Sequence, residues 1–133
     1  MNNSTKNHEI LISKVISVFS RCNITKSEDS KIYFKRTTSL KKYSHFELHG
    51  VTENPLNIRT AYAHDKSSNQ ASSAIYGLSK VKGNVIFIYD GQGWKNDSYR
   101  NALYEIKLRI GRDKVFDLKA FEQWLKGQIQ ITY

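Results

Sequence analysis

Side chains that bind metal ions or transfer protons alternate within one short segment of the chain. The segment HFELH at residues 45–49 places His45, Glu47 and His49 two positions apart. Side chains two apart on a β-strand project to the same face, so a neighbouring imidazole and carboxylate can share a transition-metal ion. The outer pair is about 13 Å apart along a strand, which is too far for one ion to reach all three side chains. We therefore interpret the segment as the solvated face of a half-buried strand.

A second segment carries side chains that bind phosphate. The sequence KRTTSLKKY at residues 35–43 contains Lys35, Arg36, Lys41 and Lys42, three hydroxyl side chains and no acid. Cations and hydroxyls are the usual donors to phosphate oxygens in complexes with nucleic acids. We predict a basic loop that follows a phosphate backbone, and the alternative is an ordinary solvated hairpin loop.

A third set of cations falls on a predicted helix. Arg100, Tyr104 and Lys107 occupy positions i, i+4 and i+7, beside the apolar stripe of that helix. Such a set can lie along a phosphate strand, or it can be an ordinary helix surface on which Glu105 balances the cations. The nucleic-acid contacts that we predict over the whole chain are Lys35, Arg36, Lys41, Lys42, Arg59, Lys66, Arg100 and Lys107.

The overall charge favours a polyanionic partner. The 133 residues include 21 Lys and Arg against 12 Asp and Glu, which gives a formal net charge of +9 at pH 7. Phosphate polyanions attract such a surface, and the release of their counterions supplies most of the affinity that does not depend on base sequence. The alternatives are a charge that serves solubility alone and an acidic protein partner. We predict a nucleic acid, in the form of double-stranded DNA, and leave a homodimer open.

The length and composition indicate one packed domain over residues 1–133. A chain of this size buries roughly two-thirds of its surface on folding. It contains 2 Trp, 8 Tyr and 6 Phe, whereas disordered chains have few aromatic residues. Residues 1–7 have no apolar cluster, so we expect a flexible tail without a secretion signal. The absence of a long apolar run and the single Cys22 lead us to expect a cytoplasmic protein with no membrane partner and no internal disulfide.

Hydrophobic periodicity predicts the order of helices and strands. Apolar residues three and four apart predict helices, alternation predicts half-buried strands, and the apolar run VIFIY predicts a strand buried on both faces. The predicted elements are a helix at 8–20, strands at 31–34, 45–51 and 56–63, a helix from 67 or 68 to 81, a strand at 85–89, a helix from 97 or 98 to 110, a strand at 115–116 and a helix capped at 117. Three adjacent strands predict an antiparallel meander, and the later alternation predicts crossovers. The expected fold is therefore α/β, with a central mixed β-sheet flanked by helices.

The segment VIFIYDGQGW at residues 85–94 resembles the hydrophobic strand and Asp-Gly-x-Gly-Trp turn of restriction enzymes that cut GATC sites. In those enzymes, too, a helix and a short strand follow. The order α-β-β-β-α-β-α-β-α is likewise similar to that of the PD-(D/E)XK nuclease superfamily, and the resemblance is best from residue 56 to about residue 126. It implies a restriction endonuclease-like fold and DNA as the ligand. We expect Trp94, at the end of the turn, to cover the core rather than to stack on a base.

The resemblance also implies where a catalytic centre would lie. Such nucleases have an acid, followed by Glu or Asp, one residue and Lys; the carboxylates hold Mg²⁺ and the lysine positions or activates water. In the register set by residues 85–94, the segment IRTA at 58–61 stands where the family has Ile-Glu-x-Lys. A guanidinium at Arg59 repels Mg²⁺, so this register predicts a degenerate site.

A second register keeps two acids. Asp29 and Glu47 would be the Mg²⁺ ligands, His49 would stand in place of the lysine, and Glu9 could add a further carboxylate. The histidine departs from the family's pattern. In the simpler interpretation, Glu47 only occupies the solvated face of its strand.

These observations lead to one prediction and two alternatives. We predict a DNA-binding protein with a restriction endonuclease-like fold and a degenerate nuclease site, which acts in a restriction system or in DNA processing. The first alternative is an active Mg²⁺-dependent endonuclease that uses Asp29, Glu47 and His49. The second is a basic factor that binds a protein, such as an immunity factor.

Overall fold

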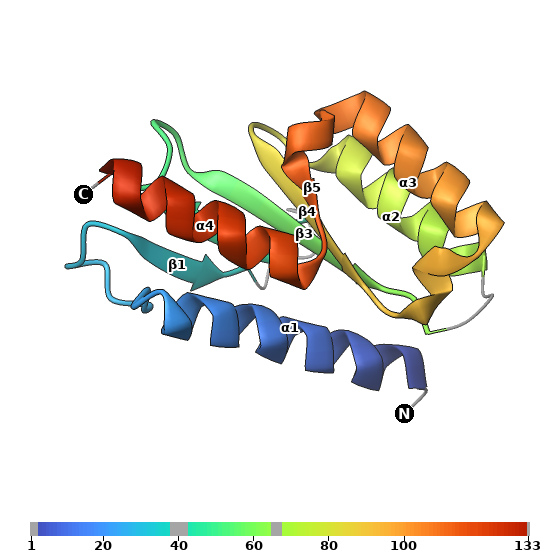
Figure 1. The fold of residues 1–133 in the computed structure, drawn as a ribbon, viewed down its shortest axis with the longest axis horizontal. Coiled ribbons are helices and arrows are strands. Elements are labelled where there is room, and N and C mark those ends of the chain that lie inside the picture. The colour runs from blue at the N-terminus through green and yellow to red at the C-terminus, as the bar shows by residue number, and fades with distance from the viewer. Residues whose placement is uncertain (1–2, 38–42, 65–67, 133) are drawn as a thin grey trace.

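The structure, a computed structural model, describes residues 3–37, 43–64 and 68–132 of the 133-residue chain. In these ranges, five strands form one mixed sheet that is flanked by four α-helices (Figure 1). The helices and strands are α1 Asn3–Arg21, β1 Tyr33–Arg36, β2 Phe46–His49, β3 Leu56–Tyr62, α2 Ser68–Lys80, β4 Val85–Asp90, α3 Asp97–Ile110, β5 Val115–Phe116 and α4 Leu118–Thr132.

The strands lie side by side in the order in which they occur in the chain. The pairs β1–β2 and β2–β3 are antiparallel, whereas β3–β4 and β4–β5 are parallel. The parallel pairs are connected through α2 and α3, because a chain that re-enters a sheet in the same direction needs a crossover. The predicted order of elements and the mixed sheet flanked by helices are therefore confirmed.

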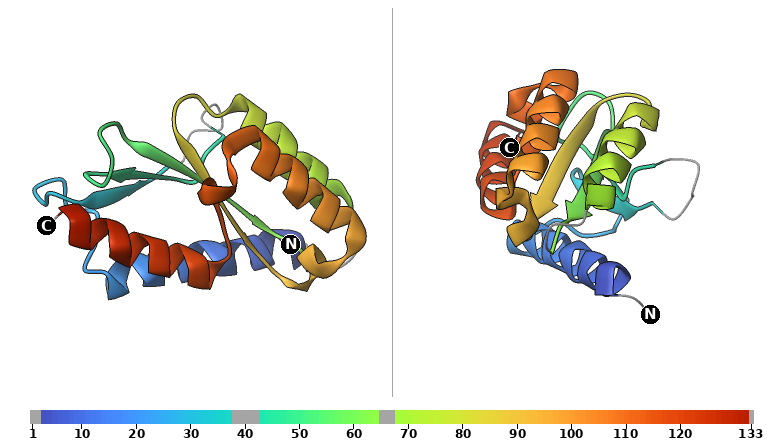
Figure 2. Two further views of the ribbon diagram at one scale, coloured as in Figure 1. Left: turned by 45° about the horizontal axis from the view of Figure 1, so that its top comes forward. Right: turned by 90° about the vertical axis from the view of Figure 1, so that its right-hand side faces the viewer.

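The sheet separates two hydrophobic cores. α1 and α4 pack on one face, and α2 and α3 pack on the other (Figure 2). Ile86 and Ile88 of β4 enter the core beneath α1 and α4, whereas Val85 and Phe87 enter the core beneath α2 and α3. Because successive side chains of a strand alternate between faces, the continuous apolar run of β4 is buried on both sides, as predicted.

The turn after β4 closes the second core. Trp94 is buried, and its ring centroid lies 5.8 Å from that of Phe87 and 5.2 Å from that of Tyr99. Gly91 has a φ of 104°, and a Cβ at this position would lie 2.2 Å from the carbonyl oxygen of Ala63. The turn therefore requires glycine there, and the prediction that Trp94 covers the core is confirmed.

Three elements, α1, β1 and β2, differ by two residues or more from their predicted bounds. α1 begins at Asn3 rather than at residue 8, so the described part of the predicted flexible tail is helical. β1 lies later than residues 31–34, and β2 is shorter than residues 45–51. Apolar spacing identifies only the residues that pack on the core, whereas the ends of an element depend on where its backbone hydrogen bonds stop.

Candidate nucleic-acid interface on the open face of the sheet

Among the residues that the structure describes, no helix covers β1 and β2 on the side of the sheet that carries α2. α2 and α3 pack over β3, β4 and β5 (Figure 2). The buried side chains of β1 and β2, which are Phe34, Phe46 and Leu48, belong to the core beneath α1 and α4. Their neighbours along each strand therefore project from the opposite side, where they are half-buried or exposed. We call this surface the open face and define it by Tyr33, Lys35, Glu47, His49 and Asn57.

Strand pairing aligns a cation, an anion and an amide across the open face. Lys35 is the Cα partner of Glu47, and Glu47 is the Cα partner of Asn57. A hydrogen bond with Glu28, whose Oε1 lies 2.7 Å from the Lys35 Nζ, raises the pKa of Lys35, and the nearby Glu47 adds to this effect. Opposed charges on neighbouring strands attract each other. The open face thus presents alternating charge rather than positive charge alone.

Glu47 and His49 form a close pair on this face. His49 Nε2 lies 3.4 Å from Glu47 Oε1, although the geometry is not that of a hydrogen bond. The imidazole stacks on the ring of Tyr33, with the centroids 4.7 Å apart and the planes inclined by 4°. The stack limits rotation of the imidazole and keeps its edge toward the carboxylate. Two of the three residues of the predicted endonuclease site are therefore together.

The third residue of that site lies elsewhere. Asp29 occupies an exposed turn before β1, and Glu9 is on α1, which covers the other face of the sheet. Over the ranges that the structure describes, no three His, Cys, Asp or Glu side chains are close enough together to hold a metal ion. The metal site that uses Asp29 and Glu47 stays a prediction.

His45 does not share the open face, and the predicted alternation is wrong at this residue. β2 begins at Phe46, and the bend before it turns the imidazole of His45 toward α1. The main-chain N–H of Thr60 donates to Nδ1 of His45 at 2.9 Å, and the ring centroids of His45 and His8 are 4.6 Å apart. Burial, together with the nearby His8 and two arginines, lowers the pKa of His45 to about 2. His45 is thus neutral and part of the packing beneath α1.

Arg59 is used within the fold. Its Nη1 donates to the carbonyl oxygen of Tyr43 at 2.5 Å, and its Nη2 donates to the carbonyl oxygen of Ser73 on α2 at 3.4 Å. Burial lowers the pKa of Arg59 from its ordinary value, yet arginine stays charged at neutral pH. The guanidinium therefore places a fixed positive charge between β3 and α2, at the position where the nuclease resemblance expects a carboxylate.

The sheet separates Arg36 from Lys35. Arg36 lies over the ring of Phe46, 5.3 Å from its centroid, and its Nη1 donates to the carbonyl oxygen of His45 at 2.7 Å. Adjacent residues of a strand point to opposite faces, so two cations that were predicted as one phosphate-binding group lie on different sides. The predicted contacts Lys41, Lys42 and Lys66 lie outside the described residues.

The cations predicted on α3 lie on the helix surface. Arg100 is exposed, with its Nη1 3.8 Å from Asp97 Oδ1, and Lys107 is half-buried. Exposed ion pairs contribute little to stability and exchange readily with solvent. Both interpretations of this set, a phosphate contact and an ordinary helix surface, therefore stay open.

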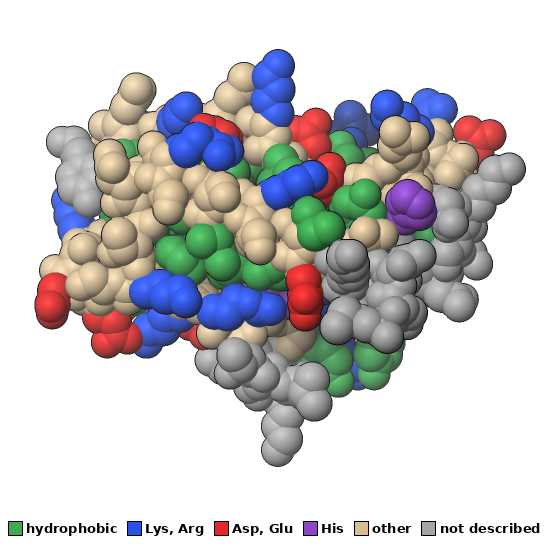
Figure 3. Space-filling model, turned by 90° about the horizontal axis from the view of Figure 1, so that it is seen from below, with side chains coloured by type: hydrophobic (Ala, Val, Ile, Leu, Met, Phe, Trp, Pro, Cys, Tyr) green, Lys and Arg blue, Asp and Glu red, His purple; other side chains and the backbone are tan. Residues whose placement is uncertain are grey.

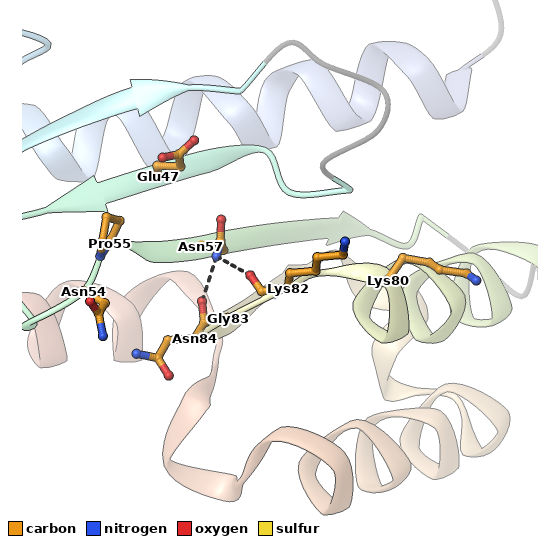
Figure 4. Close-up of a pocket in the computed structure, with 8 residues that line it drawn as sticks. All are labelled: Glu47, Asn54, Pro55, Asn57, Lys80, Lys82, Gly83 and Asn84. Atoms are coloured by element: carbon orange, nitrogen blue, oxygen red, sulfur yellow. Dashed lines mark hydrogen bonds between the residues drawn. The ribbon is translucent and has the colours of Figure 1, made fainter.

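A pocket extends the open face onto the end of α2 (Figure 4). Its volume is about 540 Å³. Close by, Tyr76 is 57% exposed, and the Nζ of Lys80 lies 5.4 Å from its ring centroid. The lining residues are Glu47, Asn54, Pro55, Asn57, Lys80, Lys82, Gly83 and Asn84. The sequence patterns did not indicate Lys80, Lys82 or Asn57. These residues come together through contacts between a strand and a loop, and such contacts leave no local pattern in the sequence.

The face that carries α1 has a different distribution of charge. In Figure 3, which views this face, Lys and Arg side chains lie in separate groups, and acids lie beside some of them. Lys14 pairs with Asp90 at 3.2 Å, and Arg21 pairs with Glu122 at 2.7 Å. Part of the positive charge on this face is thus compensated by ion pairs.

Comparison with known protein families, with curated proteins and with solved structures finds no match to this chain. The fold defines an α+β protein with a five-stranded mixed sheet, and the restriction endonuclease resemblance stays a prediction. None of the helices in the described ranges has the length and apolar character that a membrane span requires.

Proposed function

We propose that the protein binds double-stranded DNA through the open face and the adjoining end of α2. The observation that carries this proposal is that Lys80 and Lys82 line a pocket beside the open face, which itself carries Lys35. The Nζ of Lys80 lies 5.4 Å from the ring centroid of Tyr76, which is 57% exposed. Lysines contact phosphate oxygens, and an exposed aromatic ring packs on sugars or bases. The net charge of +9 adds a long-range attraction to any polyanion.

We further propose that the protein does not cleave the DNA that it binds. The charged Arg59 is held between β3 and α2 by two main-chain carbonyl groups, and a guanidinium repels Mg²⁺. The restriction endonuclease-like fold, a role in a restriction system or in DNA processing, and a cytoplasmic location belong to the same proposal, which rests for these points on the resemblance and on the composition.

Binding of a labelled blunt duplex, followed by fluorescence anisotropy, tests the first part. The affinity is expected to fall by an order of magnitude or more between about 50 and 200 mM salt, because each phosphate contact releases counterions. Lys82→Glu is expected to weaken binding roughly 10-fold, since it places a repulsive charge at the interface. Lys119→Glu on α4 makes the same change in net charge on the opposite side of the sheet and serves as the matched control.

Two results would contradict the proposal. One is an affinity for DNA that does not change with salt. The other is an equal effect of Lys82→Glu and Lys119→Glu, which would assign the binding to net charge rather than to the open face. Retention of an acidic protein in high salt, without DNA binding, would favour the protein-binding alternative.

The pair formed by Glu47 and His49 favours an endonuclease as the second candidate. A carboxylate and an imidazole 3.4 Å apart can hold one metal ion or one water molecule between them. Incubation with plasmid DNA and Mg²⁺ or Mn²⁺ separates the two candidates. Cleavage by the unaltered protein that disappears in Glu47→Ala would support the endonuclease and contradict the proposal of binding without cleavage. A plasmid that stays intact would exclude the endonuclease.

A further inference from the structure

The pocket at the end of α2 has walls that the fold holds in place. The Nδ2 of Asn57 donates to the carbonyl oxygens of Lys82 and Asn84, at 3.0 and 3.1 Å, and these bonds fasten the loop that forms one wall (Figure 4). The main-chain N–H of Asn57 donates to the same Asn84 oxygen at 2.9 Å. Gly83 provides the φ of 87° that the loop needs at its tip. The cavity is therefore present before any ligand binds.

The pocket is polar at both ends and carries opposite charges. Glu47, on β2, lies at one end, and Lys80 and Lys82 lie at the other, where α2 gives way to the loop (Figure 4). The side chain of Asn57 lies between them, and Asn54, Pro55 and Asn84 line the side of the pocket away from the lysines (Figure 4). A ligand that satisfies these groups needs a negative end near the lysines, polar atoms in its middle and an N–H donor at the end near Glu47.

We propose that this pocket binds one nucleotide, with its phosphate at Lys80 and Lys82 and the amino group of its base at Glu47. Phosphate oxygens accept from lysine, and a carboxylate is a suitable acceptor for the N4 amino group of cytosine. The volume of about 540 Å³ falls within the range of pockets for ligands of this size. The inference goes beyond the proposed binding of a duplex, because a duplex cannot enter a pocket of this size and an unpaired nucleotide can.

Calorimetric titration of the full chain with dCMP, dUMP and inorganic phosphate tests the inference. The two nucleotides differ at the base edge, where cytosine has an amino group and uracil has a carbonyl oxygen. Because the carboxylate of Glu47 attracts the amino group and repels the carbonyl oxygen, dCMP is expected to bind at least about 10-fold more tightly than dUMP. Inorganic phosphate is expected to bind more weakly than either nucleotide.

Two variants test which residue contacts the base of the nucleotide and which contacts its phosphate. Glu47→Gln is expected to remove the preference for dCMP, because the amide offers both a donor and an acceptor. Lys82→Met is expected to weaken dCMP and dUMP by a similar factor and to leave the preference intact. Lys119→Met on α4 is expected to change neither affinity. The preference of the unaltered protein is itself decisive, so the test does not depend on how well the variants fold.

The source of the nucleotide is determined by competition. If the pocket binds the end of a strand, a duplex with one unpaired dC at its end is expected to displace dCMP. If this duplex does not displace dCMP, the ligand is a free nucleotide. The proposal is overturned if no nucleotide binds, if phosphate alone binds as tightly as dCMP, or if dUMP binds as tightly as dCMP. Binding of the blunt duplex is measured by anisotropy in parallel. A protein that binds the duplex but no nucleotide contradicts only the pocket proposal, and one that binds a nucleotide but no duplex contradicts only the proposed function.

Discussion

The guanidinium of Arg59 on β3 occupies the space that a side chain at residue 77 of α2 would fill. A Cβ added to Gly77 would lie 2.1 Å from Cζ of Arg59. α2 can approach β3 at this point only because residue 77 has no side chain, and the carbonyl group of Ser73 on the preceding turn then accepts from Nη2 of Arg59. Gly77 and Arg59 together thus join β3 to the helix that borders the open face.

This contact predicts opposite effects for two helical glycines. Gly77→Ala is expected to lower the free energy of unfolding by about 1–2 kcal/mol, because the new methyl group displaces the guanidinium of Arg59 from the carbonyl groups of Tyr43 and Ser73. Gly127→Ala in α4 is the matched control: no atom lies within 4 Å of the added Cβ, so higher helix propensity is expected to stabilise the protein by about 0.5–1 kcal/mol. Urea denaturation measures both changes. Equal changes in the two variants would show that the guanidinium does not occupy this space.

His8 of α1 and His45, which packs beneath that helix, predict a loss of stability in mild acid. The pKa of His8 is lowered, and the pKa of His45 is lowered from its ordinary value of 6.5 to about 2, with burial as the largest cause in both. Arg36 and Arg59 contribute to the lowered pKa of both histidines and His8 contributes to that of His45, whereas Glu9 and the hydrogen bond with Thr60 act in the opposite direction on His8. The unfolded chain therefore binds protons more readily than the folded one, so stability is complete above about pH 6.5 and falls as the pH is lowered toward 2.

For His45 this loss amounts to about 2 kcal/mol between pH 7 and pH 5, since one pKa unit corresponds to about 1.4 kcal/mol. Urea denaturation at pH 7, 6 and 5 measures it. His45→Asn is expected to flatten the dependence, because the amide does not titrate and its oxygen can accept from the main-chain N–H of Thr60. The same slope in this variant would contradict the assignment to His45.

The hydrogen bonds of Asn57 predict a local effect on the pocket. Asn57→Ala is expected to lower the free energy of unfolding by about 1–2 kcal/mol, because the Lys82 oxygen loses its side-chain donor and the Asn84 oxygen loses one of its two donors. Asn57→Asp is expected to cost more, since it places a carboxylate against both oxygens. Asn54→Ala, an exposed residue of the same pocket, is the control and is expected to change little. Amide hydrogen exchange at residues 81–84 should accelerate in the Asn57 variants, and unchanged exchange would show that other contacts hold the loop.

Adjacent cations on β1 provide a test of which face meets DNA. Lys35→Ala is expected to reduce the slope of log affinity against log salt by about 1, because one phosphate contact is lost. Arg36→Gln removes a neighbouring charge on the opposite face of the sheet and is expected to leave the slope unchanged. Anisotropy titrations of one duplex at several salt concentrations measure both slopes. A loss in the Arg36 variant alone would move the interface to the α1 side.

Local patterns in the sequence were sufficient to predict the helices and strands and their order along the chain. The alternation of Phe46 and Leu48 and the continuous run of β4 follow from the two-residue period of a strand, and the helices follow from the spacing of three and four. Short connections then required an antiparallel meander, and the later helices required parallel crossovers. Each of these inferences depends on backbone geometry that residues close in sequence share.

Only the tertiary structure decided what the polar side chains do. Strand register aligns Lys35, Glu47 and Asn57, and the approach of α2 places Gly77 against Arg59. The bend before β2 turns His45 toward His8, which lies far away in sequence. A polar residue has the same local spacing whether it faces water, a main-chain carbonyl or another charge. Its partner is selected by contacts between distant segments, which form only when the sheet and its two helical layers pack together.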